Sequence, residues 1–496
     1  MGNFLNLVFD KEIDGCFIPN GNTDLIIESL DKVRKFYKID NWDDFTRHCH
    51  DGMWDVYVKE TGEKVYNYVY NKPFKWYGYW EGIDDKKYRF KLQNSDERWT
   101  VNLKNLDDIV DGEENIYLID FKGNVLFIFA EEPEWMSPTE RMYKGGKLFN
   151  LDDKVLTALR NRKIKLVLSN IEEGGGDINL FFDCIYESIK AFDLPSDLIY
   201  VIHGNHNVEE LYDEYCLQNK ITNKIKVYKS EYLFEIISKS MQMNIGRIDK
   251  LGYEIKNLTE EEVLGNLDRD KKFILLNRNA YKPHRFYLLS KLNEMGALDD
   301  SYFSCLFNNE GPIRYDNYLE PILSEEDFIK DLPIMETFQH LGSVKIPEER
   351  TQLANLKEFF DVFANTDHTL FKNSYFSIVS ETCFEDNSAH LTEKTCKALY
   401  YFHPFIVVGG YKHLHHLKER GFKTFDKWID ESYDLIKDPK ERMKAVLKEI
   451  EKINDINILK KIYIESFDIL KHNHDMYMDL KNKSFLSKIL VQIAND

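Results

Sequence analysis

The sequence predicts an α/β protein with two Rossmann-like domains that face a cleft, and with an added N-terminal module that is β-rich or α+β. Two observations favour this class. Short apolar segments of strand length alternate with segments whose apolar residues repeat at helical spacing, as in parallel sheets with crossover helices. The alternation occurs in two series, which begin near residues 126 and 271, so we expect two such domains.

The chain has 496 residues, enough for about three domains at roughly 150 residues each. We expect an accessory module, two Rossmann-like domains and a set of C-terminal helices, at residues 1–125, 126–265, 266–435 and 436–496 respectively. The accessory module is predicted from alternating aromatic segments, Val65-Tyr-Asn-Tyr-Val-Tyr-Asn71 and Trp76-Tyr-Gly-Tyr-Trp80, with turn-forming residues between them.

The elements of the first Rossmann-like domain are two buried strands, each followed by a helix. The strands are expected at 163–169 and 198–203, and the helices at 179–191 and 208–216. A short apolar run, Val125 to Ala130, precedes them.

The second domain repeats this arrangement and is followed by helices. Its strands are expected at 272–276, 375–379 and 404–408, and its helices at 283–295 and 392–401. Beyond Tyr433, apolar stripes predict helices over 443–453, 458–470 and 480–493. In open parallel sheets, ligands bind at the carboxyl ends of the strands, which is where we look for functional residues.

The composition excludes several classes of protein. The formal net charge is −19, from 85 acidic and 66 basic residues, so a global basic footprint for nucleic acid is absent. No apolar run approaches the roughly 20 residues of a membrane span, and the N-terminus does not have the pattern of a secretory signal. The seven cysteines include no Cys-x-x-Cys pair, which indicates reduced thiols and a cytoplasmic protein.

The first candidate binding segment joins the strand at 272–276 to the helix that follows it. The strand ends at Asn277, and Pro283 is a favoured first residue of a helix, which places Arg285 in the first helical turn. A cation is unfavourable at the positive end of the helix dipole unless a bound anion neutralises its charge. Since helix N-termini and arginine both bind phosphate, the segment predicts a phosphate site. The alternative is a surface arginine on an ordinary loop.

The second candidate segment has the same layout. Thr392 is a good N-cap, which places Glu393 and Lys394 in the first turn of a helix. A carboxylate beside a cation is a suitable pair for binding a nucleotide. Glu393 would bind the ribose hydroxyls and Lys394 the diphosphate. The alternative is helix capping with a solvated charge pair.

These segments together resemble the donor-site motifs of the α1,3-fucosyltransferase-like glycosyltransferases. The resemblance rests on Ser380-Glu-Thr382, Leu391-Thr-Glu-Lys-Thr395, His403-Pro-Phe-Ile-Val-Val-Gly409 and the upstream pair of Asn277 and Arg285. The stretch Gly421 to Asp434 is similar to a segment of phage and bacterial proteins of this type. The similarity spans about residues 270–435.

The resemblance implies a GT-B architecture and an inverting transfer of sugar from a nucleotide sugar, without a metal or other cofactor. Residues 266–435 would then bind the donor and residues 126–265 the acceptor. It implies that Arg285 and Lys394 hold the donor diphosphate, Glu393 the ribose and Glu381 the donor sugar. Asn277 and Thr392 belong to the same donor-binding segments.

Two positions depart from the family pattern. The family usually has Tyr two residues before Thr-Glu-Lys, where this chain has His390, and Asn after the first Glu, where it has Thr382. The resemblance therefore does not imply fucose as the sugar.

A general base is expected in the first Rossmann-like domain. An inverting transferase needs one to accept the proton of the attacking hydroxyl. The strand at 163–169 runs into a turn with three carboxylates and three glycines, which makes Glu173 the preferred base, ahead of Glu172 and Asp177. The alternative is a solvated turn in which the glycines allow positive φ.

The metal-binding patterns are weak. Asp268-Arg-Asp270 precedes a strand instead of ending one, so we interpret it as a solvated turn. His203 and His206 lie at the end of a predicted strand, but no acidic residue stands at a spacing typical of metal ligands. A second group, on a helix expected at the surface, comprises His413, His415 and His416.

The sequence therefore predicts a nucleotide-sugar-dependent glycosyltransferase that needs no metal. Its acceptor would be either a glycan or a hydroxymethylated base in phage DNA. The alternative is a non-catalytic protein that binds a glycan or a nucleotide.

Overall fold

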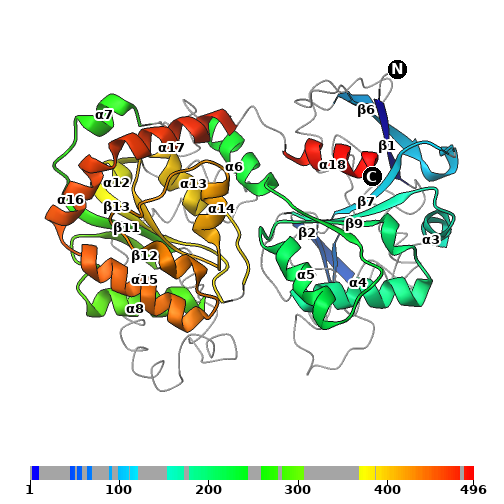
Figure 1. Cartoon of the computed structure of the whole chain (residues 1–496), viewed down its shortest axis with the longest axis horizontal. Helices are drawn as coiled ribbons and strands as arrows, with labels where there is room; N and C mark the ends of the chain where they lie inside the picture. The colour runs from blue at the N-terminus through cyan, green and yellow to red at the C-terminus, as the bar shows by residue number, and fades with distance from the viewer. Residues whose placement is uncertain are drawn as a thin grey trace. The chain divides into compact units, whose positions relative to one another are not determined.

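A computed structural model of the chain forms two compact units (Figure 1). Unit 1 comprises Met1–Tyr232 with Ser484–Asp496, and unit 2 comprises Leu233–Lys483. The structure describes residues 3–9, 45–50, 53–58, 64–69, 89–91, 99–110, 112–120, 153–171, 178–243, 258–277, 282–305, 368–385, 387–480 and 485–496.

Unit 1 is built on a seven-stranded sheet in which all neighbours are parallel except β5 and β6. In spatial order the strands are β10 (Lys226–Lys229), β9 (Ile199–His203), β8 (Lys165–Asn170), β7 (Asn115–Asp120), β1 (Asn3–Phe9), β6 (Trp99–Asn105) and β5 (Arg89–Lys91). A separate antiparallel sheet contains β2 (Phe45–His50), β3 (Met53–Val58) and β4 (Lys64–Val69).

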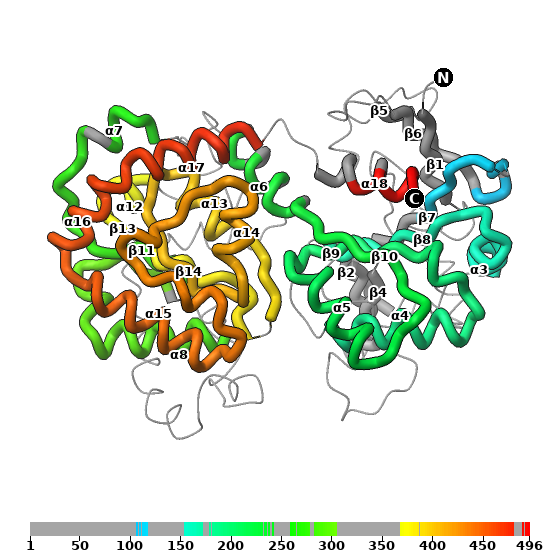
Figure 2. Tube along the Cα trace, in the orientation of Figure 1, coloured from blue at the N-terminus to red at the C-terminus, as the bar shows by residue number. Residues whose placement is uncertain are grey.

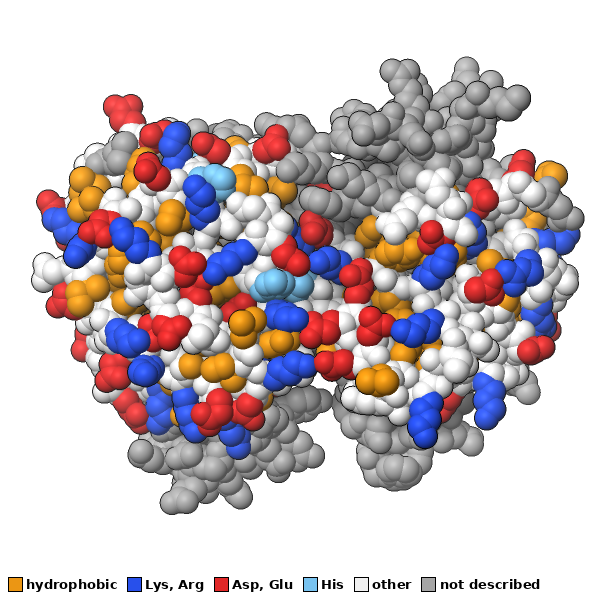
Figure 3. Space-filling view, in the orientation of Figure 1, with side chains coloured by type: hydrophobic (Ala, Val, Ile, Leu, Met, Phe, Trp, Pro, Cys, Tyr) orange, Lys and Arg blue, Asp and Glu red, His pale blue; other side chains and the backbone are white. Residues whose placement is uncertain are grey.

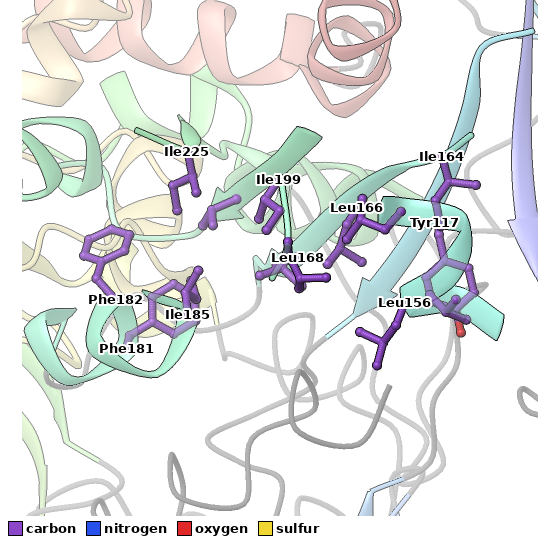
Figure 4. Close-up of a cluster of buried hydrophobic side chains, with 14 of the residues drawn as sticks. Tyr117, Leu156, Ile164, Leu166, Leu168, Phe181, Phe182, Ile185, Ile199 and Ile225 are labelled. Atoms are coloured by element: carbon purple, nitrogen blue, oxygen red, sulfur yellow. The ribbon is translucent and has the colours of Figure 1, made fainter. Parts of the chain in front are cut away.

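The helices of unit 1 bury the apolar faces of the central strands. They are α3 (Asp153–Arg160), α4 (Ile178–Phe192), α5 (Val208–Gln218) and α18 (Phe485–Asn495), with short 3₁₀ helices η3 (Leu106–Asp108) and η5 (Ser196–Leu198). Figure 4 shows part of this core, where Leu166 and Leu168 of β8 lie among aromatic and aliphatic side chains of α3, α4 and β7. Burial of such side chains is the main stabilising contribution to a sheet of this kind.

Unit 2 is built on a four-stranded, fully parallel sheet. In spatial order its strands are β12 (Tyr302–Cys305), β11 (Lys271–Asn277), β13 (Ser374–Ser380) and β14 (Phe405–Val408). The chain passes from β11 to β12 on one side, then returns to the other side of β11 for β13 and β14. The direction of winding therefore reverses between β11 and β13.

Helices cover both faces of the unit 2 sheet. They are α6 (Tyr232–Met243), α7 (Glu260–Leu264), α8 (Pro283–Glu294), α12 (His368–Lys372), α13 (Glu393–Tyr400), α14 (His413–Glu419), η6 (Glu431–Leu435), α15 (Pro439–Ile453), α16 (Ile456–Glu465) and α17 (Phe467–Asp479). Figure 1 shows α8 and α15 on one side of the sheet, and α13 and α17 on the other. This is the layering of a doubly wound α/β domain.

The predicted α/β class, with two parallel sheets in separate parts of the chain, is confirmed. The predicted strands and helices of both Rossmann-like series are found, each within two residues of its expected ends. The predicted helix over 458–470 is instead two helices, because Ser466 ends α16 and begins α17. The aromatic segment Trp76–Trp80 and the run Val125–Ala130 lie outside the described residues.

The compact units divide the chain differently from the predicted boundaries at 125, 265 and 435. Strands β1, β6 and β7 belong to the same sheet as β8, β9 and β10, so residues before 125 contribute to the first α/β unit. The helices α15, α16 and α17 belong to unit 2, whereas α18 belongs to unit 1. Sequence periodicity shows strands and helices, but it does not show which distant strands pair.

The helix α18 belongs to unit 1, and Figure 2 shows its trace near that of β7. The Lys165 Nζ of β8 donates to the carbonyl oxygens of Ile493 and Ala494, at 3.0 and 3.1 Å. The Tyr228 hydroxyl of β10 donates to the Asp496 carboxylate at 2.6 Å. No helix in the described part of the chain is both long enough and apolar enough to cross a bilayer.

Candidate functional site

The reversal between β11 and β13 places the candidate site of unit 2. In open α/β sheets, ligands bind outside the carboxyl ends of the strands at such a switch point. Strand β11 ends at Asn277, and β13 ends at Ser380, immediately before Glu381. The two candidate segments of the sequence therefore meet at one edge of one sheet.

Two buried polar side chains at this edge have no hydrogen-bond partner within the described structure. Both the Asn277 amide nitrogen and its oxygen are unpartnered, as is the Ser380 hydroxyl. Asn277 is fully buried and Ser380 is 2% exposed. The β11–β13 register pairs Ile274 with Ser377, and its continuation sets Asn277 beside Ser380. Since buried polar groups are nearly always hydrogen-bonded, this pair points to a ligand or water.

Arg285, in the first turn of α8, holds the end of β13. Its Nη2 donates to the carbonyl oxygens of Ser380 at 3.3 Å and Glu381 at 3.0 Å. Burial lowers the pKa of the guanidinium, and the nearby carboxylates of Glu393, Glu381 and Glu385 oppose this effect. Arg285 is thus brought to the predicted place, but as a buried group bonded to the main chain.

The buried His284 pairs with the partly exposed Glu385, a contact that the sequence did not indicate. The His284 Nδ1 lies 2.7 Å from the Glu385 carboxylate, and its Nε2 lies 2.9 Å from the Glu381 carbonyl oxygen. Burial would raise the pKa of Glu385, but His284 and Lys282 overcome it and lower that pKa to about 2. The His284 main-chain N–H donates to the same carboxylate at 3.4 Å, so Glu385 caps α8.

Glu381 bonds to the start of α13. Its fully buried carboxylate accepts from the main-chain N–H of Thr392 at 3.3 Å and of Thr395 at 3.4 Å. The hydroxyls of both threonines donate to it as well, that of Thr395 at 2.5 Å. The resemblance implied that Glu381 holds the donor sugar, whereas the described contacts of its carboxylate are internal.

Glu393 and Lys394 lie side by side in the first turn of α13, as predicted. The Lys394 Nζ donates to the Glu393 carboxylate at 2.6 Å and to the hydroxyls of Thr392 and Thr382 at 3.2 and 3.4 Å. Burial would raise the pKa of Glu393, but Lys394 and Lys397 lower it to about 2. The predicted N-cap is confirmed, because the Thr392 hydroxyl accepts from the Lys394 main-chain N–H.

The charged side chains at the two helix starts have partners within the protein. We expected a bound anion to balance Arg285 and Lys394. In the described residues, Glu393 pairs with Lys394, and Glu381 and Glu385 occupy the main-chain N–H groups at the starts of α13 and α8. An anionic ligand would therefore exchange with, or add to, carboxylates of the protein.

The glycine pair after β14 allows a close approach between two loops. A Cβ on Gly410 would lie 1.5 Å from the carbonyl oxygen of Ser388, so only glycine fits there. The contact holds the segment between β13 and α13 against the end of β14.

The helix α14 is largely buried, which corrects our expectation of a surface helix. His413 and His416 are 1% and 5% exposed. Burial lowers the pKa of His413 to about 4, although Glu381 opposes the shift. His413 Nε2 lies 3.2 Å from the Thr395 hydroxyl. In the parts of the chain that the structure describes, no cluster of three or more His, Cys, Asp or Glu side chains could hold a metal ion.

In unit 1, the predicted base residues Glu172, Glu173 and Asp177 lie outside the described residues. The strand that precedes them ends at Asn170, as β8. His203, at the end of β9, pairs with Asn170 in the sheet register, and its Nε2 lies 3.2 Å from the Asn170 amide nitrogen. The carboxyl edge of this sheet therefore also carries buried polar groups.

The sequence matches no protein-family model and no curated protein sequence. Among solved structures, a similar chain is an α,α-trehalose-phosphate synthase (UDP-forming) from Burkholderia vietnamiensis, with 12% identity and a TM-score of 0.32 over 70% of this chain and 73% of that chain. The α,α-trehalose 6-phosphate synthase from Burkholderia multivorans gives 12% identity and 0.32 over 71% and 73%. A variant of S. aureus TarM, in complex with fondaparinux, α-GlcNAc-glycerol and UDP, gives 8% and 0.28 over 97% and 100%. These likenesses are distant, and nothing about substrate or activity follows from them.

Proposed function

We propose that the protein is a glycosyltransferase of GT-B type, which transfers a sugar from a nucleotide-sugar donor to an acceptor hydroxyl with inversion. The observation that supports it best is the meeting of the motif residues at the switch point of the unit 2 sheet. Asn277 and Arg285 come from one segment of the chain and Glu381 from another, and the two segments meet at the carboxyl ends of β11 and β13. This is where an open α/β sheet binds nucleotides.

We assign the donor contacts to groups at this edge that can bind a ligand. Among the described residues, the Asn277 amide and the Ser380 hydroxyl at this edge have no hydrogen-bond partner. Lys394 would contact the diphosphate, since its side chain is 16% exposed and an ammonium group can exchange the Glu393 carboxylate for a phosphate oxygen. Arg285 would be the second diphosphate contact, since its Nη2 lies at the end of β13 and guanidinium groups bind phosphate oxygens. Glu393 would bind the ribose, and Thr392 fixes the turn that carries both residues.

The proposed chemistry needs one general base and no metal. Two cations near the leaving diphosphate can stabilise its charge as bonds break at C1 of the sugar. Glu173 is the proposed base, which would accept the proton of the acceptor hydroxyl as its oxygen attacks C1. Glu172 and Asp177 are the next choices.

The acceptor classes to test are a glycan and hydroxymethylated DNA. Figure 3 shows acidic and basic side chains interspersed over the visible face of the described residues, without a continuous basic area. DNA-binding surfaces carry clustered Lys and Arg that neutralise phosphates, so this face favours the glycan. DNA as the acceptor would require a basic groove on another part of the surface.

The test of the proposed function begins with binding. A panel of nucleoside diphosphates and their sugars is screened by thermal shift against the full chain. We expect at least one to raise the melting temperature, as mass action requires for a ligand of the folded state. The best donor is then assayed for hydrolysis and for transfer to glycan and to hydroxymethylated DNA.

The outcomes separate the proposal from its rival. Binding with turnover supports the transferase. Binding without hydrolysis or transfer would favour the non-catalytic glycan- or nucleotide-binding protein. No stabilisation by any nucleotide or nucleotide sugar would contradict the transferase and the nucleotide-binding form of its rival, and would leave only a glycan-binding protein.

A further inference from the structure

The buried carboxylate of Glu381 lies at the centre of a hydrogen-bond network that joins three elements. We name this network the carboxylate clamp: Glu381 after β13, Thr392 and Thr395 at the start of α13, and His413 at the start of α14. All four side chains are buried. None of the sequence patterns assigned a role to Thr395 or His413.

The direction of each hydrogen bond in the clamp follows from counting hydrogens. A carboxylate can only accept, so both threonine hydroxyls donate to Glu381. Each hydroxyl has one hydrogen, so the Thr395 oxygen must accept from the His413 Nε2–H at 3.2 Å. In the same way, the Thr392 oxygen must accept from the main-chain N–H and the Nζ of Lys394.

Two chains of donors therefore end on one carboxylate. One runs from His413 through Thr395, and the other from Lys394 through Thr392. Both oxygens of Glu381 are used, and a buried carboxylate that loses a donor is costly. The position of Lys394 is thus coupled to that of Glu381, although the two side chains do not bond directly.

We infer that the carboxylate clamp positions the first turn of α13 for donor binding, so that Glu381, Thr395 and His413 act through Lys394 and Glu393 and not by touching the donor. The inference rests on the proposed function for the identity of the ligand. It assigns Glu381 a role different from the sugar contact that the resemblance implied. Thr395 and His413 are positioning residues of the same site.

The first test needs no ligand. Hydrogen–deuterium exchange is measured on the full chain over peptides that cover residues 387–400. Thr395→Val removes one hydroxyl at nearly constant volume, and Thr395→Ser restores it. We expect faster exchange at the first turn of α13 in Thr395→Val and a return to within about twofold of wild type in Thr395→Ser, because a hydrogen bond to a charged group is among the strong ones.

A matched control is available on another helix of unit 2. Asp438 caps α15 by accepting from the Glu441 main-chain N–H at 2.8 Å, so Asp438→Ala removes a cap without touching the clamp. It should lower the melting temperature and leave exchange at α13 unchanged. Unchanged exchange in Thr395→Val would overturn the clamp, whatever the ligand.

The second test uses UDP, GDP, ADP and CDP and, for turnover, the sugar derivative of the diphosphate that stabilises the wild type most. Thr395→Val should raise the donor Kd and donor KM about tenfold, the scale of one hydrogen bond to a charged group, and leave the acceptor KM unchanged. Thr395→Ser should restore them, and Asp438→Ala should have no effect. Faster exchange without a change in donor affinity would overturn the positioning role. Failure of the wild type to bind any diphosphate would instead overturn the proposed function, and the exchange result would stand.

Discussion

At the scale of single residues, charged side chains at the site have partners within the protein. Lys394 pairs with Glu393, and His284 lies against Glu385. Among the residues described at this edge, the buried amide of Asn277 and the hydroxyl of Ser380 have no hydrogen-bond partner. Ligand binding at this edge would then exchange one set of charged contacts for another, and would give the unpartnered pair its hydrogen bonds.

The cations give the first prediction. Lys394→Ala and Arg285→Ala should each weaken donor binding by about 1.5–3 kcal/mol, the scale of hydrogen bonds to charged groups. Arg285→Ala should also lower stability, because it leaves the carbonyl oxygens of Ser380 and Glu381 without their buried donor. Isothermal titration calorimetry with the best nucleotide sugar measures the affinities. Lys427→Ala is the control, since Lys427 is 65% exposed and pairs with Glu465. Wild-type affinity in both site variants, with the fold intact, would contradict the site.

The base gives the second prediction. Glu173→Gln keeps the shape of the side chain but removes the proton acceptor, so turnover should fall by roughly 10²–10⁴ while donor affinity stays nearly constant. Single-turnover kinetics and calorimetry measure the two quantities separately. Glu172→Gln is the matched neighbour and should have the smaller effect. Near-full turnover in Glu173→Gln would move the search for the base to Glu172 and Asp177.

At the scale of elements, strands and helices could be predicted because each follows from local pattern. The apolar run before Asn277 predicted residues 272–276, and β11 spans Lys271–Asn277. The helix start at Thr392 could be predicted because an N-cap is a local signal. The cap of α8 could not, since its acceptor is Glu385, 101 residues from His284. Strand pairing is equally non-local, which is why the contribution of β1 and β6 to the unit 1 sheet was not predicted.

The histidine of α14 gives a third prediction. The pKa of His413 is lowered to about 4 by burial, so the folded state keeps the ring neutral where the unfolded chain, with a pKa of about 6.5, binds a proton. The unfolded state therefore binds more protons below pH 6.5, and stability falls as the pH falls from about 6.5 to 4, by about 3 kcal/mol for this residue.

Urea unfolding of the wild type and of His413→Gln at pH 7, 6 and 5 measures this effect. His413→Gln should be less stable at pH 7 because it disturbs the contact with Thr395, but its stability should depend less on pH. Parallel curves for the two proteins would show that His413 does not carry the expected proton linkage.

At the scale of the whole molecule, each unit carries polar groups at the carboxyl edge of a parallel sheet. In unit 2 these groups are Asn277, Ser380 and Glu381, and in unit 1 they include Asn170 and His203. A transferase must bind two substrates, and the proposal assigns one to each unit. The assignment of donor to unit 2 rests on the cations at the start of α8 and α13.

The fourth prediction concerns metal removal. If Arg285 and Lys394 stabilise the leaving diphosphate, turnover should be retained in excess EDTA, because no divalent ion is required for that charge. The assay is transfer of sugar with and without EDTA, followed by addition of Mn²⁺ or Mg²⁺. Loss of turnover in EDTA with recovery on adding either ion would contradict the proposed role of the two cations.

The return of α18 to unit 1 has a consequence for the order of synthesis. Unit 2 is one continuous stretch, Leu233–Lys483, whereas unit 1 is completed by Ser484–Asp496. On the ribosome, all residues of unit 2 are therefore made before the carbonyl oxygens that Lys165 binds exist. Domains generally fold as units during synthesis, but unit 1 can acquire the contacts of α18 only after all of unit 2 has been made.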